Sequence, residues 1–364
     1  LDCYNNVPHV GHAHPHVVNA VARQSATLNT NTRYLYDSIL EYSERLAALL
    51  PGELGVFLFV NSGSEANDLA WRIARAATGR AGAVVTANAY HGGTGEIAHL
   101  SPSGGGAVAD HVRTVPAPGS GGSGEMERAI TALDSAGHGL AAFMVDSTFS
   151  SDGILEPSGD WLKNVFEQTR AAGGLCIADE VQAGFGRLGE WWGFQCHGVV
   201  PDIVTLGKPM ANGYPAGAVI TSPTILAEFA RASDYFSTFG GNPVACMAAL
   251  AVLDVIERED LVAGADEVGR YLRRRLEALA ARHPGIAEVR GRGLFQGVEL
   301  VKDGEPAAQQ TRAVALALRD RGVLVGTEGP DGNVLKIRPP LACRQRHVDI
   351  LVDTLDEVLT DRPL

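Results

Sequence analysis

The spacing of apolar and polar residues predicts an alternation of helices and strands through most of the chain. Apolar residues recur at helical spacing in residues 14–28 and 37–50, and the apolar run at 56–60 is typical of a buried strand that leads into a helix ending near Ala77. Further strands are predicted at 83–87, 141–145, 175–179, 202–206 and 217–221, and further helices at 158–172 and 222–231. Strands that are apolar throughout and separated by helices indicate an α/β fold with a mostly parallel sheet covered on both faces.

The pattern changes to an α+β texture after Pro243. Two long amphipathic segments (243–258 and 261–282) are followed by strands near 287–300, a helix at 306–321, strands at 323–327 and 333–338, and a closing helix. This change places a domain boundary near Gly241-Asn242-Pro243, and a chain of 364 residues suits two domains. We therefore expect a large domain at 33–243 and a smaller α+β domain formed by 1–32 and 244–364.

The composition is that of a globular protein, with 45% apolar and 20% charged residues. The chain has 30 Lys and Arg against 42 Asp and Glu, a net charge of −12, and no basic tract, so nucleic acid is not an expected partner. No apolar run approaches the ~20 residues that span a membrane, so no membrane association is expected either.

Five scattered cysteines without a C-x-x-C pair predict reduced thiols in a cytoplasm. Leu1 is not an initiator, and we expect the natural N-terminus to precede it.

A possible phosphate site lies between the predicted strand at 56–60 and the helix that follows it. The connection reads Ser62-Gly63-Ser64-Glu65-Ala66-Asn67. Backbone N–H groups and the positive end of the helix dipole at such a turn bind phosphate, and serine hydroxyls add donors. The simpler interpretation is that a serine only caps the helix. This connection is not a G-x-G-x-x-G or P-loop pattern, which disfavours a dinucleotide or nucleoside triphosphate.

Two further predicted strands end at or beside side chains that could bind a ligand or act in catalysis. Asp179 ends the strand at 175–179 and Glu180 follows it, at the sheet edge where open α/β folds bind ligands. A carboxylate there binds a cationic ring nitrogen or a metal, although an acid in this place often only caps or pairs. Lys208, one of only four lysines, follows the strand at 202–206. A partly desolvated lysine has a lowered pKa and acts as an amine nucleophile or Schiff-base residue.

Four histidines near the N-terminus, at positions 9, 12, 14 and 16, superficially suggest metal ligands. No Asp, Glu or Cys partner stands among them and Pro15 interrupts the element, so we expect no metal. The chain also has no G-x-S-x-G motif that would indicate a serine hydrolase. The ordered combination of a phosphate cradle, Tyr90-His91-Gly92, Asp179 and Lys208 instead suits a pyridine aldehyde phosphate. The acid would keep the ring nitrogen protonated and the lysine would carry the imine.

Over nearly its whole length the chain resembles the class III aminotransferase-like enzymes of fold type I, which use pyridoxal 5′-phosphate. The segments that carry the resemblance are NSGSEAND (61–68), YHG (90–92), IADEVQAGFGR (177–187), PDIVTLGKPMANGYP (201–215) and FSTFGGNPVAC (236–246). The resemblance implies that Lys208 holds the cofactor covalently, that Asp179 pairs with the ring nitrogen, and that the enzyme is a homodimer or a dimer of dimers with shared sites. It also implies cofactor contacts from Gly63 and Ser64 to the phosphate, from Tyr90 and Val181 to the two ring faces, from Gln182 to the ring hydroxyl, and from Thr238 of a second subunit.

Three stretches are similar to the phospho-lyase branch of this family, which includes ethanolamine-phosphate phospho-lyase. They are LDCYNNVPHVGHAHP (1–15), NTNTRYLYDS (29–38) and VLKIRPPL (334–341). Many class III aminotransferases have a glutamate at the position of Ser151, and ornithine-type enzymes have an arginine at that of Lys336. A substrate without a second carboxylate would need neither residue. The branch also has a longer stretch where this chain reads Pro116-Ala117-Pro118-Gly119-Ser120, within the segment 101–124 that we predict to be a surface loop.

The resemblance leaves two activities open. The first is elimination of phosphate from an O-phosphorylated amino alcohol, for which Arg33, Lys336 and Arg338 are candidate phosphate ligands because they lie in the branch-like stretches. Each of the three could equally form a surface or inter-subunit ion pair. The second activity is amino transfer from an amine or ω-amino acid to a keto acid. A binding protein on a retired enzyme scaffold is disfavoured because Lys208 and Asp179 are both present.

Overall fold

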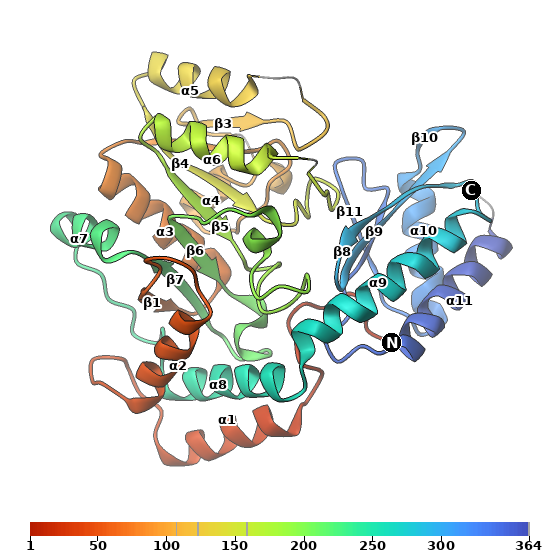
Figure 1. Ribbon diagram of the computed structural model, residues 1–364, viewed down its shortest axis with the longest axis horizontal. Coiled ribbons are helices and arrows are strands. Elements are labelled where there is room, and N and C mark those ends of the chain that lie inside the picture. The colour runs from red at the N-terminus through yellow and green to blue at the C-terminus, as the bar shows by residue number, and fades with distance from the viewer. Residues whose placement is uncertain (107, 122–123, 158, 363–364) are drawn as a thin grey trace.

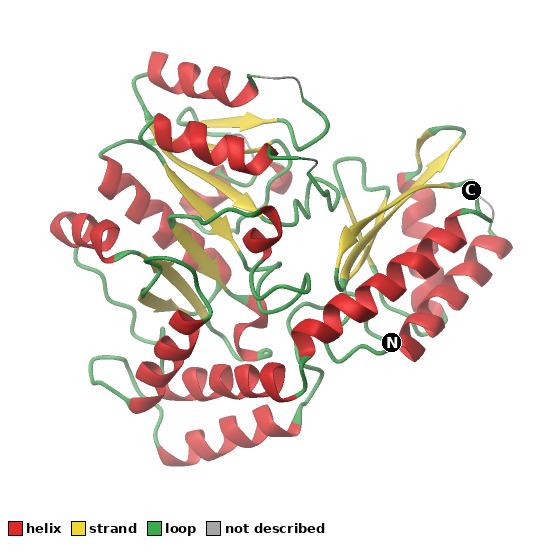
Figure 2. Ribbon diagram, in the orientation of Figure 1, coloured by secondary structure: helices red, strands yellow, loops and turns green. Residues whose placement is uncertain are grey.

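The computed structural model describes residues 1–106, 108–121, 124–157 and 159–362 and contains two β-sheets (Figures 1 and 2). The predicted loop at 101–124 and the predicted helix at 158–172 are thus described except at 107, 122–123 and 158. Within these ranges, no helix is long and apolar enough to cross a membrane.

The larger sheet has seven strands in the order β1-β7-β6-β5-β4-β2-β3. The strands are β1 (Val56–Val60), β2 (Gly82–Thr86), β3 (Val112–Val115), β4 (Leu140–Asp146), β5 (Leu175–Asp179), β6 (Ile203–Leu206) and β7 (Gly217–Thr221). Only β7 among them runs antiparallel to its neighbours β1 and β6. The expected α/β fold with a mostly parallel sheet is therefore confirmed.

Helices cover both faces of this sheet, because successive residues of each strand point to opposite sides. In β2, Ala83 and Val85 pack with α3 and α7 in one apolar cluster, whereas Val84 packs in a second cluster with residues of α5 and α6. The α-helices up to residue 232 are α1 (Pro15–Thr27), α2 (Asp37–Ala48), α3 (Gly63–Thr78), α4 (Gly95–His99), α5 (Glu125–Ser135), α6 (Trp161–Ala171) and α7 (Pro223–Ala232).

The prediction that 101–124 is entirely a surface loop is wrong. Residues Val112–Val115 form the edge strand β3, which pairs parallel to β2, and Pro102–Gly104 form a short 3₁₀ helix. Val112 and Val115 are buried. A four-residue strand is a weak signal in a stretch dominated by Gly, Ser and Pro, and pairing with β2 is what stabilises it.

The smaller sheet joins β10 (Glu305–Pro306), β9 (Phe295–Lys302), β12 (Val334–Ile337) and β11 (Gly326–Glu328), and β8 (Ile286–Arg292) also pairs with β9. It lies beside α9 (Leu261–Ala280), α10 (Ala308–Asp320) and α11 (Gln345–Asp361) on the right of Figure 1. Helix α8 (Pro243–Arg258) instead packs against α1 and α2. We keep the division into 33–243 and 1–32 with 244–364 as a proposal, in which α8 is the helix that connects the two parts.

Candidate active site

The carboxyl ends of the parallel strands position the side chains that the sequence singled out. β5 ends at Asp179, β6 is followed by Lys208, and β1 is followed by Gly63 at the start of α3. Because parallel strands end at the same edge of a sheet, these residues meet around one cavity of about 330 Å³. Its lining contains Ser62, Gly63, Ser64, Asn67, Tyr90, His91, Gly92, Asp146, Asp179, Val181, Gln182 and Lys208. The structure thus brings together all the predicted cofactor residues except Thr238.

Lys208 begins the short 3₁₀ helix η3 (Lys208–Ala211), and its side chain is exposed to this cavity. The surrounding protein limits the hydration of the ammonium group, and this desolvation lowers the pKa of Lys208, whereas the negative charge of Asp179 acts in the opposite direction. A lowered pKa increases the fraction of free amine at neutral pH. The free amine is the form that attacks an aldehyde and accepts a proton.

Asp179 is buried and held by a network of hydrogen bonds. Its Oδ2 accepts from Asn67 Nδ2 and lies against His91 Nδ1, both at 2.8 Å, and its Oδ1 accepts from the N–H of Val181 at 3.1 Å. Thr205 Oγ1 donates to Asn67 Oδ1 at 2.6 Å and so fixes the orientation of that amide. An ionised carboxylate only accepts hydrogen bonds, and these donors suit its ionised form.

Sequence reasoning quoted the segments that contain Asn67 and His91 but gave neither residue a role, and it gave none to Asp146. Asn67 and His91 are buried polar residues, and a polar side chain at a core-facing position of a helix is the signal that points to Asn67. Asp146 ends β4 and lines the cavity while its Oδ1 accepts from the N–H of Thr148 at 3.0 Å.

Glu180, the second acid of the predicted pair, points away from this cavity. Ser147 Oγ and the N–H groups of Gly193 and Phe194 donate to its carboxylate at 2.6–2.9 Å. Complete burial raises the pKa of Glu180 to about 7, and these three donors act in the opposite direction. Glu180 therefore anchors the loop at 192–194, and Asp179 is the acid that is available to a ligand.

The start of α3 offers donors to a phosphate. The first N–H groups of a helix have no partner within it, and Ser62 Oγ caps the N–H of Glu65, which leaves the amides of Gly63 and Ser64. A Cβ atom on Gly63 would lie 2.8 Å from Val181 Cγ2, so glycine is required for this close approach. Tyr90 is 48% exposed and Val181 is buried, and both line the cavity.

A second cavity of about 500 Å³ shares Tyr90, Gln182 and Lys208 with the first. It extends towards the smaller sheet, where Glu328, Lys336 and Arg338 line it. Two of the predicted phosphate ligands, Lys336 and Arg338, therefore lie in a cavity that also contains Lys208.

Arg33 and Thr238 are absent from the lining of both cavities among the residues described for this chain. The Arg33 guanidinium instead lies 4.8 Å from the centre of the Phe236 ring, and Thr238 is exposed. A single chain thus does not bring Arg33 to the predicted phosphate site, whereas Thr238 is predicted to act in the site of a second subunit.

The four N-terminal histidines make separate contacts. His12, His14 and His16 lie 2.7–3.2 Å from Asp2, Glu259 and Asp254, and buried His9 lies 2.6 Å from the carbonyl oxygen of Phe185.

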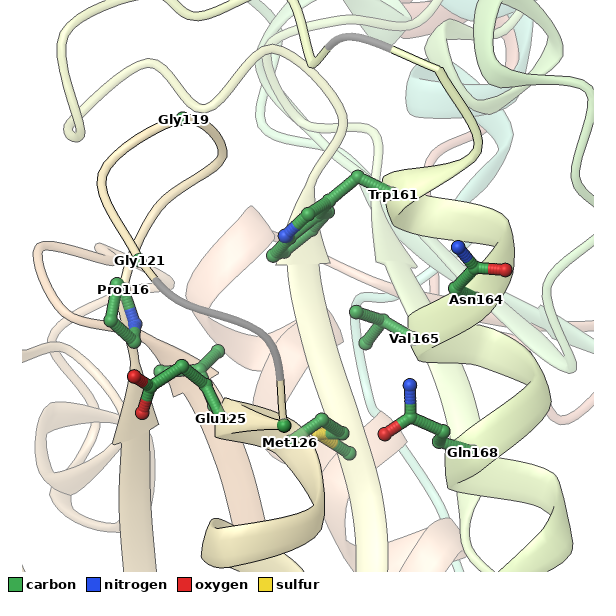
Figure 3. A pocket seen from close by; sticks show the side chains of 11 residues that line it. Pro116, Gly119, Gly121, Glu125, Met126, Trp161, Asn164, Val165 and Gln168 are labelled. Carbon is green, nitrogen blue, oxygen red and sulfur yellow. The ribbon is translucent and has the colours of Figure 1, made fainter.

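Another cavity, of about 370 Å³, lies between α5 and α6 beside Trp161 and Gln168 (Figure 3). Among the residues that the structure describes, it shares no lining residue with the cavities around Lys208.

An amine, a buried carboxylate and a helix start with free amides around one cavity define a site for pyridoxal 5′-phosphate. The model of the family described as aminotransferase class III matches residues 2–359, and the chain belongs to this family. It is accordingly a two-domain enzyme of fold type I that depends on pyridoxal 5′-phosphate.

Three similar proteins have names that refer to two different activities. A Drosophila melanogaster protein named alanine–glyoxylate aminotransferase 2-like is 40% identical over 99% of this chain and 78% of its own length. Ethanolamine-phosphate phospho-lyase homolog 1 of Caenorhabditis elegans is 39% identical over 99% of this chain and 84% of its own. The structure of a phospholyase from Arthrobacter in complex with phosphoethanolamine is 44% identical, with a TM-score of 0.96 over 100% of this chain and 90% of that one.

Proposed function

We propose that this enzyme is a phospho-lyase that eliminates phosphate from an O-phosphorylated amino alcohol such as phosphoethanolamine. The observation that carries the proposal is the environment of Arg338, which is 5% exposed in the cavity that contains Lys208. Its guanidinium donates to Gln182 Oε1 and, through Nε and Nη2, to the carbonyl oxygen of Tyr4 at 3.2 and 2.9 Å. All these acceptors are neutral, so a buried cation faces the cavity with its charge uncompensated by the groups it contacts.

A buried guanidinium of this kind suits a phosphate group. Desolvation lowers the pKa of Arg338 to about 10, which still leaves it charged at neutral pH. Three of its five N–H groups are used in the contacts above, and the remaining two suit an anionic oxygen. Lys336 lies beside it but donates to Glu328, so Arg338 is the cation available to a phosphate at this wall. The Arthrobacter phospholyase, with its bound phosphoethanolamine, supports the same substrate class for this chain.

The residues around Lys208 can then carry out elimination. Pyridoxal 5′-phosphate supplies, when bound, a sink for the electrons left after proton removal. Asp179 would hold the proton on the ring nitrogen, and the amides of Gly63 and Ser64 would bind the cofactor phosphate. The Lys208 amine removes the proton from the substrate carbon that bears nitrogen. The C–O bond at the next carbon breaks, and phosphate leaves with the bonding electrons while Arg338 stabilises its charge.

A direct assay tests the proposal against the alternative. We expect phosphoethanolamine to yield acetaldehyde, ammonia and phosphate in equal amounts without any keto acid. Colorimetric phosphate release and a coupled aldehyde assay measure this stoichiometry. Turnover that depends on pyruvate or 2-oxoglutarate and releases no phosphate would contradict it. That result would support amino transfer from an amine or ω-amino acid, the second candidate, which the name of the Drosophila relative favours.

Replacing Arg338 tests how phosphate is recognised. We expect Arg338→Gln to raise the KM for phosphoethanolamine about tenfold to a hundredfold, because a buried charge-assisted contact to phosphate is lost. Cofactor affinity, measured from cofactor absorbance after dialysis, is expected to change little. Arg344→Gln is a matched control because its side chain is exposed. An equal loss of cofactor and substrate binding would contradict the assignment.

We also propose that a second copy of this chain completes the site. Exposed apolar side chains gather in two loops and on α2, and the residues are Tyr34 (69% exposed), Leu35 (84%), Leu40 (48%), Phe236 (49%) and Phe239 (66%). Thr32 Oγ1 donates to the carbonyl oxygen of Ser237 at 3.1 Å, so the two loops pack together. Arg33 and Thr238 lie in these same loops. A partner that covers this surface would bury the apolar side chains and bring both residues towards its own site.

The cysteines bear on the cellular location of the enzyme. Buried, scattered cysteines such as Cys3, Cys176 and Cys246 suit a reducing compartment, and we propose the cytoplasm.

A further inference from the structure

The cavity wall that faces Lys208 contains an ion pair that the proposed reaction does not use. Lys336 Nζ donates to Glu328 Oε2, and both side chains line the cavity. Glu328 ends β11, and Lys336 lies on the neighbouring strand β12. Glu328 is opposite Val334 in the antiparallel register, so Lys336 is its diagonal neighbour two residues further along β12. Diagonal neighbours on one face are within reach of long side chains.

Because this ion pair is largely buried in the cavity wall, its charges affect which ligands can bind there. The Lys336 side chain is 9% exposed and that of Glu328 is 22% exposed, so water screens their interaction less than it would at a surface. Lys336 Nζ also lies 5.9 Å from the centre of the Phe295 ring. Burial and the neighbouring charge of Arg338 lower the pKa of Lys336, while the Glu328 carboxylate acts in the opposite direction.

Glu328 lowers the positive charge that the described lining residues of this cavity can offer to a ligand. The cavity has three basic side chains, Lys208, Lys336 and Arg338, and one acidic side chain, Glu328. Lys208 is committed to the cofactor and Lys336 is paired with Glu328. Arg338, whose contacts are with neutral oxygens, is the cation left for a ligand. One anionic group can be compensated there. A second would be buried without a counter-charge, which is unfavourable.

We infer that Glu328 is a specificity-determining residue that limits the substrate to one anionic group besides its amine. Because Glu328 pairs with Lys336, the cavity disfavours ligands with two separate anionic groups, such as dicarboxylates. This inference rests on the proposed function for the identity of that single group, a phosphate. It also predicts which acceptors an amino-transfer reaction could use, namely keto acids with one carboxylate.

Binding of two unreactive ligands of equal chain length tests the inference. The holoenzyme is titrated by calorimetry with glutarate, which has two carboxylates, and with pentanoate, which has one. We expect Glu328→Gln to lower the dissociation constant of glutarate relative to that of pentanoate about tenfold, because Lys336 becomes available to the second carboxylate. The double variant Glu328→Gln/Lys336→Met is expected to return this ratio to the wild-type value.

Two control variants show whether the effect depends on the carboxylate of Glu328 itself. One tests a change of side-chain size without loss of charge, and the other tests a change in the net charge of the protein. Glu328→Asp keeps the carboxylate and is expected to keep the wild-type ratio. Glu305→Gln removes an exposed acid of the same sheet outside the cavity and is expected to have no effect. An unchanged ratio in Glu328→Gln would overturn the inference, as would a gain that survives Lys336→Met or also appears in Glu328→Asp. Neither ligand reacts, so a failure here is distinct from a failure of phosphate release, which tests the proposed function.

Discussion

Replacing Lys208 with alanine is expected to reduce turnover of phosphoethanolamine by about 10⁴-fold or more. The same amine attaches the cofactor and moves the proton, and removal of a positioned general base alone costs about 10² to 10⁴ in rate. Initial rates of phosphate release at saturating substrate and cofactor measure the loss. The fold should survive, because the Lys208 side chain is exposed to the cavity and packs in no core cluster among the described residues.

A covalent readout makes this prediction independent of activity. Borohydride treatment followed by intact-mass analysis is expected to add one cofactor to the wild type and none to Lys208→Ala. Lys302→Ala is the matched control, because Lys302 is an exposed lysine at the end of β9 and should keep both activity and labelling. Appreciable phosphate release by Lys208→Ala, or labelling that persists in it, would show that another group carries the chemistry.

Much of the large sheet could be predicted from the sequence because most of its strands are apolar at nearly every position. β1 and β5 were expected at 56–60 and 175–179 and lie at those residues, since continuous apolar runs bounded by polar turns have few alternative interpretations. β3 was missed for the opposite reason. Its four residues stand among Gly, Ser and Pro, and only the neighbouring strand shows that they are extended. Helix α5 at 125–135 was missed as well, because the glycine-rich segment before it obscured its start.

The candidate site likewise contains residues that the sequence could locate and contacts that it could not. Asp179 and Lys208 stand out because each ends or follows a strand that a sequence pattern can locate. The pairing of Lys336 with Glu328 depends on the register of two short strands, which apolar periodicity does not determine. Two of the three partners of Asp179, Asn67 and His91, come from α3 and from the loop after β2, and only the folded chain brings them to it.

Asp179→Asn is expected to leave the chain folded and to lower the rate of phosphate release by roughly 10² to 10³, the cost of removing one preorganised charge from an active site. A neutral amide cannot hold the proton on the ring nitrogen, so the electrons left after proton removal lose their sink. The amide oxygen could still accept from Asn67 and His91, but the amide nitrogen would then face the N–H of Val181, where Asp179 Oδ1 now accepts. A modest loss of cofactor affinity should accompany the loss of rate.

A modified cofactor distinguishes the proton-holding role of Asp179 from a purely structural one. Pyridoxal phosphate methylated on its ring nitrogen has a permanent positive charge and needs no proton there. Reconstitution with it is expected to restore a substantial part of the activity of Asp179→Asn, while Asp320→Asn, which changes an exposed acid, should behave as wild type with either cofactor. If the methylated cofactor gives no recovery although it binds, Asp179 acts by shaping the site through Asn67 and His91. A near-normal rate of Asp179→Asn with the ordinary cofactor would instead show that this carboxylate only caps the end of β5.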